Sequence, residues 1–197
     1  MRQRKAIRSR LFLTRSRLSS VTLADLSLEF SRSEARLDKL LDKHDSAMLN
    51  RTPGPESWSA LQCIEHLTLT NRLNLASLGV ALRERPRIQA NDDLIHPGWL
   101  WRFLLKLVDP STRLKGFAPR VLRPSSCLDP IETRNRFLET HKRLHRLMGE
   151  CSGFDVNRLR FPHPVIRLHI SAGVTFWLLA LHEGRHFQQA ERAVGSR

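Results

Sequence analysis

Hydrophobic positions recur at helical spacing in four long segments of the chain. The segments cover residues 22–48, 57–83, 129–149 and 171–194, and within them apolar side chains mostly return every three, four or seven positions. The last segment is apolar on nearly all sides over its first half, which is typical of the most buried helix of a protein. No segment shows a convincing strand alternation, so the pattern predicts an all-α fold.

Helix start signals mark most of these segments. Thr22 is the expected N-cap of the first helix, with Asp25 at N3, and Ser57 is the expected N-cap of the second. Asp129 followed by Pro130 is a strong start signal for the third. We expect one stripe of the second helix to face the core, and it comprises Gln62, His66, Leu69, Leu73, Ala76 and Val80.

A long connection joins the second and third helices. Residues 84–128 contain one aromatic, amphipathic segment at 99–107 and are otherwise irregular. A connection of this length can cross the length of a bundle, and long loops often carry function. We expect the 99–107 segment to form a short helix that covers the open end of the bundle, with a membrane-surface or partner helix as the alternative. Four long helices with one crossover predict a four-helix bundle.

The net charge of +14 is unevenly distributed. Residues 1–21 hold seven Lys and Arg residues and no acidic residue, so this leader supplies half of the net charge. Such a segment can bind nucleic acid or acidic lipid, and its Arg and Ser content is also that of an organelle transit peptide. We favour a solvated, disordered leader over nucleic-acid contact. Residues 22–197 are assigned to the bundle domain.

Cysteine usage and hydropathy limit the setting. The three cysteines, Cys63, Cys127 and Cys151, form no disulfide framework, which fits a reducing cytoplasmic location. No apolar run approaches the ~20 residues that a membrane-spanning helix needs.

His182 and His186 lie four residues apart in the last helix. Residues at this spacing share one helix face, and neutral imidazoles bind zinc, nickel, copper and iron. The same stretch also matches the His-Glu-x-x-His helix of zinc peptidases, in which Glu183 would be the general base. The extended peptidase motif requires Gly and His further on, where this chain has Gln189 and Arg192. A third ligand is therefore expected upstream.

Two further patterns bear on the ligand set. His66 lies on the expected core stripe of the second helix, where a buried imidazole needs a partner. Cys63, one turn earlier, is either a fourth ligand or a small core residue. His141 and His145 form a rival pair with the same spacing on the third helix. Spacing alone does not choose between the two pairs.

Two motifs in the right order resemble the DinB/YfiT-like superfamily. The first is Ser57-Trp-Ser-Ala-Leu-Gln-Cys-Ile-Glu-His-Leu67, and the second is His163-Pro164 followed by Leu181-His-Glu-Gly-Arg-His-Phe-Gln-Gln189. The resemblance covers about residues 22–195. It implies an up-down-down-up bundle with the long crossover between the second and third helices.

The resemblance also implies a divalent metal ion, zinc or nickel, bound by His66, His182 and His186, and it makes His141 and His145 ordinary helix residues. Relatives include thiol-dependent S-transferases and metal-dependent hydrolases, so the implied function is a metal-dependent transferase that uses a low-molecular-weight thiol on a small-molecule substrate. A hydrolase or a non-catalytic bundle that binds metal or a partner is the alternative, and a homodimer is allowed. Three His ligands leave open metal positions, as catalytic sites do. Gln189 shares the His face and is expected to orient a ligand, whereas Glu183 points off it and receives no role.

Overall fold

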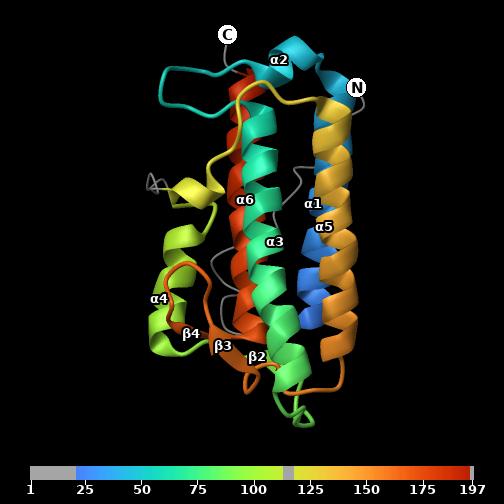
Figure 1. Ribbon diagram of the computed structural model, residues 1–197, viewed down its shortest axis with the longest axis vertical. Helices are drawn as coiled ribbons and strands as arrows, with labels where there is room; N and C mark the ends of the chain where they lie inside the picture. The colour runs from blue at the N-terminus through green and yellow to red at the C-terminus, as the bar shows by residue number, and fades with distance from the viewer. Residues whose placement is uncertain (1–20, 113–117, 196–197) are drawn as a thin grey trace, which may run out of the picture.

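Four long helices run side by side along the longest axis of the molecule (Figure 1). They are α1 (Leu23–Lys43), α3 (Ala60–Glu84), α5 (Pro130–Cys151) and α6 (Ala172–Gly195) in the computed structural model, which describes residues 21–112 and 118–195. The all-α four-helix bundle expected from the sequence is confirmed. The basic leader lies outside the described residues, apart from Val21.

The helices follow the up-down-down-up order. In Figure 1, α1 rises, α3 and α5 both descend, and α6 rises again. The crossover that joins α3 to α5 carries β2 (Leu94–Ile95), α4 (Trp99–Val108) and the short 3-10 helix η2 (Arg120–Leu122). This connection returns the chain from the lower to the upper end of the bundle, because α5 starts at the same end as α3.

Side-chain caps explain where the helices begin. Thr22 and Asp25 form the predicted capping box of α1, and the Asp129 side chain accepts a hydrogen bond from the Glu132 backbone at the start of α5. The predicted N-cap of α3 was wrong by two residues. Ser59 caps this helix because Gln62, three positions on, returns the hydrogen bond, whereas Ala60 follows Ser57 at that spacing.

The first predicted helix is interrupted near its end. His44 adopts an extended backbone, and α2 (Ser46–Asn50) then starts as a separate short helix. The Asp45 side chain accepts a hydrogen bond from the Met48 backbone and so provides a second N-cap. The periodicity hid this break because Met48 and Leu49 continue the helical spacing.

The predicted core stripe of α3 was wrong in its second half. Ala76 and Val80 are exposed, whereas Leu75 and Leu78 are fully buried. Both α6 and α5 pack against α3. A helix that is covered on two sides buries most of its circumference, so no single stripe describes it. The first half of α6 is buried as expected, since only Leu178 within Ala172–Leu181 is partly exposed. The expectation that it is the most buried helix is wrong, because α3 buries a larger part of its length.

Short strands close the lower end of the bundle. β1 (Val21–Thr22) pairs with β2, and β3 (Arg160–Pro162) pairs with β4 (His169–Ser171), both antiparallel. With two or three residues each, they are too short to produce a readable alternation.

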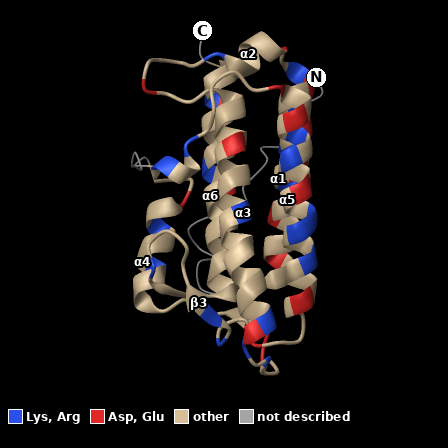
Figure 2. Ribbon diagram, viewed as in Figure 1, with Lys and Arg blue, Asp and Glu red and all other residues tan. Residues whose placement is uncertain are grey.

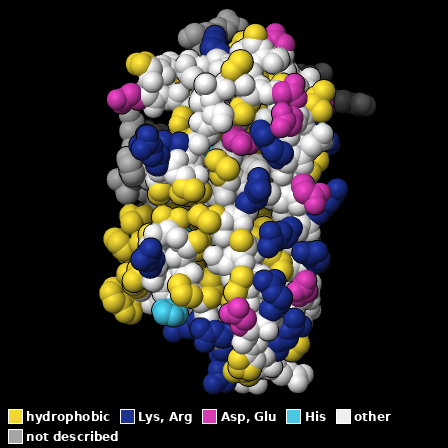
Figure 3. Space-filling model, in the orientation of Figure 1, with side chains coloured by type: hydrophobic (Ala, Val, Ile, Leu, Met, Phe, Trp, Pro, Cys, Tyr) yellow, Lys and Arg dark blue, Asp and Glu magenta, His cyan; other side chains and the backbone are white. Residues whose placement is uncertain are grey.

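The aromatic segment forms α4, which packs against the side of α6 rather than over the end of the bundle (Figure 1). Trp101 and Leu105 are buried, and the Trp101 indole donates a hydrogen bond of 2.9 Å to the His169 carbonyl oxygen. Trp99 and Phe103 on the opposite face are 83% and 56% exposed. Figure 3 shows hydrophobic side chains gathered over this part of the surface.

Charged residues recur along α5 (Figure 2). They form ion pairs within the helix and with neighbouring elements, such as Arg136 with Glu132 and with Glu65. Among the described residues, none of the helices combines the length and the apolar character required for a membrane span.

Candidate metal site

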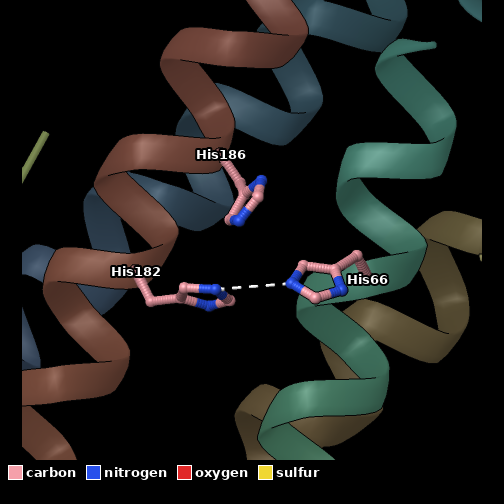
Figure 4. A group of neighbouring side chains, drawn as sticks. All are labelled: His66, His182 and His186. Carbon is pink, nitrogen blue, oxygen red and sulfur yellow. Dashed lines mark hydrogen bonds between the residues drawn. The ribbon is translucent and has the colours of Figure 1, made fainter. Parts of the chain in front are cut away.

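Three histidines from two helices meet between α3 and α6. His66 projects from α3 toward His182 and His186, which lie one turn apart on α6 (Figure 4). One ring nitrogen from each residue lies within 4.8 Å of the other two, and the Nε2 atoms of His66 and His182 are 3.3 Å apart. Two ligands about 2.1 Å from one ion lie roughly 3.0–3.4 Å apart at ordinary bond angles. The spacing is thus suited to a shared ion.

The crossover fixes the orientation of His66. Its Nδ1 atom lies 2.7 Å from the backbone carbonyl oxygen of Leu122 in η2. A carbonyl oxygen only accepts, so Nδ1 carries the hydrogen and Nε2 presents a lone pair toward His182. Metal-binding imidazoles are commonly oriented in this way by a second hydrogen bond. The irregular crossover therefore provides part of the site.

The three imidazoles are held in the neutral form. Burial lowers the pKa of His66, and burial together with the neighbouring His186 and His66 rings lowers the pKa of His182 well below its ordinary value. Burial, His66 and Arg185 lower the pKa of His186 to about 3, against the opposing effect of a hydrogen bond to Gln189. Neutral rings keep the lone pairs that a metal ion needs.

Trp58, which precedes α3, forms an aromatic wall of the site. Its ring centroid lies 4.7 Å from that of His66 and 5.8 Å from that of His186, and it stacks on the latter. The sequence motif contained Trp58 only as part of a helix start. The position of Trp58, just before the helix that carries His66, is the sequence feature that could have indicated this packing.

The cluster fits a divalent transition-metal ion. The Nδ1 atoms of His182 and His186 are buried and have no hydrogen-bond partner among the described residues. Such nitrogens are costly to bury without a partner, and three imidazoles form a donor set that zinc and nickel accept.

Two other candidates lie outside this cluster. Cys63 packs in the core with residues such as Leu37 and Phe137, and burial raises the pKa of its thiol to about 12 against the opposing effect of Arg192. Glu183 is fully buried and accepts a hydrogen bond from Asn71, on a side of α6 that faces His141. A peptidase mechanism with Glu183 as general base is therefore excluded by its position.

The rival pair, His141 and His145, lies on α5 and faces Glu34 on α1. It does not join His182 and His186. These residues are also not ordinary helix residues, because His141 is fully buried and contacts two carboxylates.

Comparisons with known proteins bear on the fold and the family of the chain. The chain is similar over 98% of its length to the solved structure of YfiT from Bacillus subtilis, described as having an unusual four-helix bundle topology, with a TM-score of 0.56, 13% sequence identity and 91% of that chain covered. A search of curated proteins finds no match. Residues 29–190 match the family model of the DinB superfamily. That range contains the three histidines, all of α3 and α5, and most of α1 and α6, and the chain belongs to the DinB superfamily.

Proposed function

We propose that the chain is a divalent-metal-dependent enzyme that transfers a small thiol to an electrophilic small molecule. The observation that carries the proposal is the convergence of three neutral imidazoles, with His66 already oriented by the Leu122 carbonyl. His66, His182 and His186 would hold the ion, zinc or nickel. An ion with three such ligands keeps an open position and lowers the pKa of a thiol or water that takes it.

The surroundings of the cluster favour a thiol over water as the nucleophile. No carboxylate of the described residues joins the three histidines, and the adjacent Glu183 faces His141 instead. Hydrolysis usually requires a general base for water. A thiol ionises near pH 8.5 without help and needs less activation. Trp58 would cover an apolar part of the substrate, and Gln189 would orient its polar part.

A second candidate function is hydrolysis. YfiT is described as a probable metal-dependent hydrolase. A substrate with its own basic group would supply the general base that the three-histidine cluster lacks.

Metal analysis and thiol titration test the proposal. His182→Ala and His186→Ala should each lose one bound ion per chain, whereas His96→Ala, an exposed histidine, should lose none. In the cobalt-substituted protein, a small thiol should produce a near-ultraviolet charge-transfer band that is absent in His66→Ala. Cys63→Ala should keep the ion and the band.

Turnover then separates the two reactions. A panel of small thiols with a chromogenic electrophile should show thiol-dependent product formation that requires His66. Turnover that requires His66 but no thiol would establish the hydrolase instead. A protein that binds no ion at the three histidines would refute both.

A further inference from the structure

A second group of ligand-type side chains lies between α1 and α5. It consists of Glu34 on α1 and His141 and His145 on α5, with one ligand atom of each within 4.8 Å of the other two. Glu34 Oε1 lies 3.0 Å from His141 Nδ1 and 3.2 Å from His145 Nε2. Neither helix contributes a ligand to the three-histidine site, so this group is separate.

The group is closed on its inner side and open on its outer side. His141 is fully buried, and Phe30 and Phe137 pack around its ring with centroid distances of 5.9 Å and 4.1 Å. The side chains of His145 and Glu34 are each about one third exposed, at 33% and 32%. An ion can therefore reach the group from solvent while its inner ligand is held by packing.

Glu183 orients the inner ligand. Its Oε1 atom lies 3.1 Å from His141 Nε2 and accepts a hydrogen bond of 2.8 Å from Asn71. When His141 donates its Nε2 hydrogen to this carboxylate, Nδ1 keeps a lone pair that points toward Glu34. A carboxylate behind an imidazole is the usual arrangement around a metal-binding histidine, and it fixes the tautomer of the ring.

One oxygen atom, Glu34 Oε1, faces both imidazoles at 3.0 and 3.2 Å. These separations match the roughly 3.0–3.4 Å expected between ligands of one ion. Two imidazoles and a carboxylate form a donor set for zinc or ferrous iron.

We infer that Glu34, His141 and His145 form a second binding site for a divalent transition-metal ion, with Glu183 as the positioning residue behind His141. The ion would join α1 to α5. In the superfamily resemblance the metal site is the three-histidine cluster alone, and this second site is built from other helices.

Cobalt binding to the full chain tests the inference. In the double variant His182→Ala, His186→Ala, which lacks the first site, we expect one Co²⁺ per chain and visible ligand-field bands. Adding His145→Ala or Glu34→Gln to that background should remove the ion and the bands. These two residues are partly exposed, so their replacement leaves the buried His141 in place.

The matched control is His96→Ala in the same background. His96 also lies beside a carboxylate, with its Nε2 atom 3.6 Å from Asp92, but both side chains are more than half exposed. This variant should keep the ion. Glu183→Gln should keep the stoichiometry and weaken Co²⁺ binding by roughly 10- to 100-fold.

The results that test this second site can be told apart from those that test the three-histidine site. A folded double variant that binds no Co²⁺ overturns the inference, as does an ion that survives both His145→Ala and Glu34→Gln. An ion lost from the wild type only through His145 and Glu34, with none at the three histidines, would uphold the inference and refute the proposed function.

Discussion

At the residue scale, Trp58 and Leu122 hold the imidazoles of the three-histidine site by different means. Trp58 stacks on His186 and contacts His66 through its ring. Leu122 accepts a hydrogen bond through its backbone carbonyl. Both contacts restrict rotation of the rings before any ion is bound. The rings would therefore lose less conformational entropy when they bind an ion.

Trp58→Ala should weaken zinc binding at this site by roughly tenfold to a hundredfold, because two imidazoles lose their neighbouring ring. Trp58→Phe keeps an aromatic face and should lose less. Competition with a chromophoric chelator measures the affinity. The control is Trp99→Ala, whose side chain is 83% exposed. Equal affinities for Trp58→Ala and wild type would show that the stacking has no effect on binding.

The sequence predicted that His66, His182 and His186 would come together, which they do, but not the groups that support their rings. The i,i+4 spacing placed His182 and His186 on one face, and the family resemblance brought in His66 and set aside His141 and His145. The contact between the Leu122 carbonyl oxygen and His66 could not be predicted from the sequence, because every residue carries a backbone carbonyl. The contacts of Glu183 with Asn71 and His141 were missed. A helical projection shows the direction of a side chain but not which residues of the neighbouring helices it meets.

At the element scale, the start of α6 depends on a close approach. A Cβ atom at Gly173 would lie 2.9 Å from Val156 Cγ2 and 3.1 Å from the Ile95 side chain. Both neighbours are buried, so neither can move away easily. The glycine allows α6 to begin against β2 and the segment before β3.

Gly173→Ala should lower the free energy of unfolding by about 1–3 kcal/mol, because the extra methyl group overpacks this contact. Gly149→Ala is the matched control within α5, where a Cβ would meet nothing within 4 Å. It should raise the stability by about 0.5–1 kcal/mol through helix propensity. Urea unfolding measures both, and a neutral Gly173→Ala would contradict the packing argument.

The β3–β4 turn contains a buried histidine that acts as an acceptor. His163 Nδ1 accepts hydrogen bonds from the Val165 and Ile166 backbones, at 3.2 and 3.4 Å. Burial lowers the pKa of His163 in the folded state. The folded state therefore binds fewer protons than the unfolded state, and its stability falls as the pH drops through the unfolded pKa of about 6.5.

His163→Asn should reduce this pH dependence. Between about pH 7.5 and pH 5.5, the free energy of unfolding should fall less in the variant than in wild type, because one proton-linked group is gone. The other histidines are common to both proteins and cancel in the comparison. Urea unfolding at the two pH values measures the fall in the free energy of unfolding for each protein. An equal fall in both would show that His163 does not cause the pH dependence.

Element boundaries were predicted where the signal was local. Thr22 and Asp129 cap their helices through residues three positions away, which the sequence displays. The buried face of α3 was not predictable from one stripe, because it depends on how many neighbours surround the helix. The strands were missed because each has only two or three residues, and the pairing of β1 with β2 also joins distant segments, as with Val21 and Ile95.

At the scale of the whole molecule, the helical periods and the long crossover predicted the fold class, and the family resemblance added the up-down-down-up order. The path of the crossover was not predictable, since its irregular residues carry no periodicity. That path matters because it brings Leu122 to His66 and α4 to α6. The prediction that the basic leader contributes nothing to the bundle belongs to this scale as well.

Deleting residues 1–20 should leave the melting temperature nearly unchanged, because this acid-free segment has no apolar periodicity. Deleting residues 1–22 should lower it. Val21 is buried and pairs with Ile95, and Thr22 caps α1. Loss of the cap alone costs about 1 kcal/mol, which is about 2–4 °C for a chain of this size. A large fall with the shorter deletion would show that the leader supports the fold.

The pairing of α3 with α6 also determines when the three-histidine cluster can form during synthesis of the chain. His66 and His182 are separated by 116 residues, so at about 5–20 residues per second the ribosome makes the second roughly 6–23 s after the first. During that interval the face of α3 that α6 will cover is open to water and to chaperones. The proposed three-histidine site can load its ion only after α6 has left the ribosome and docked.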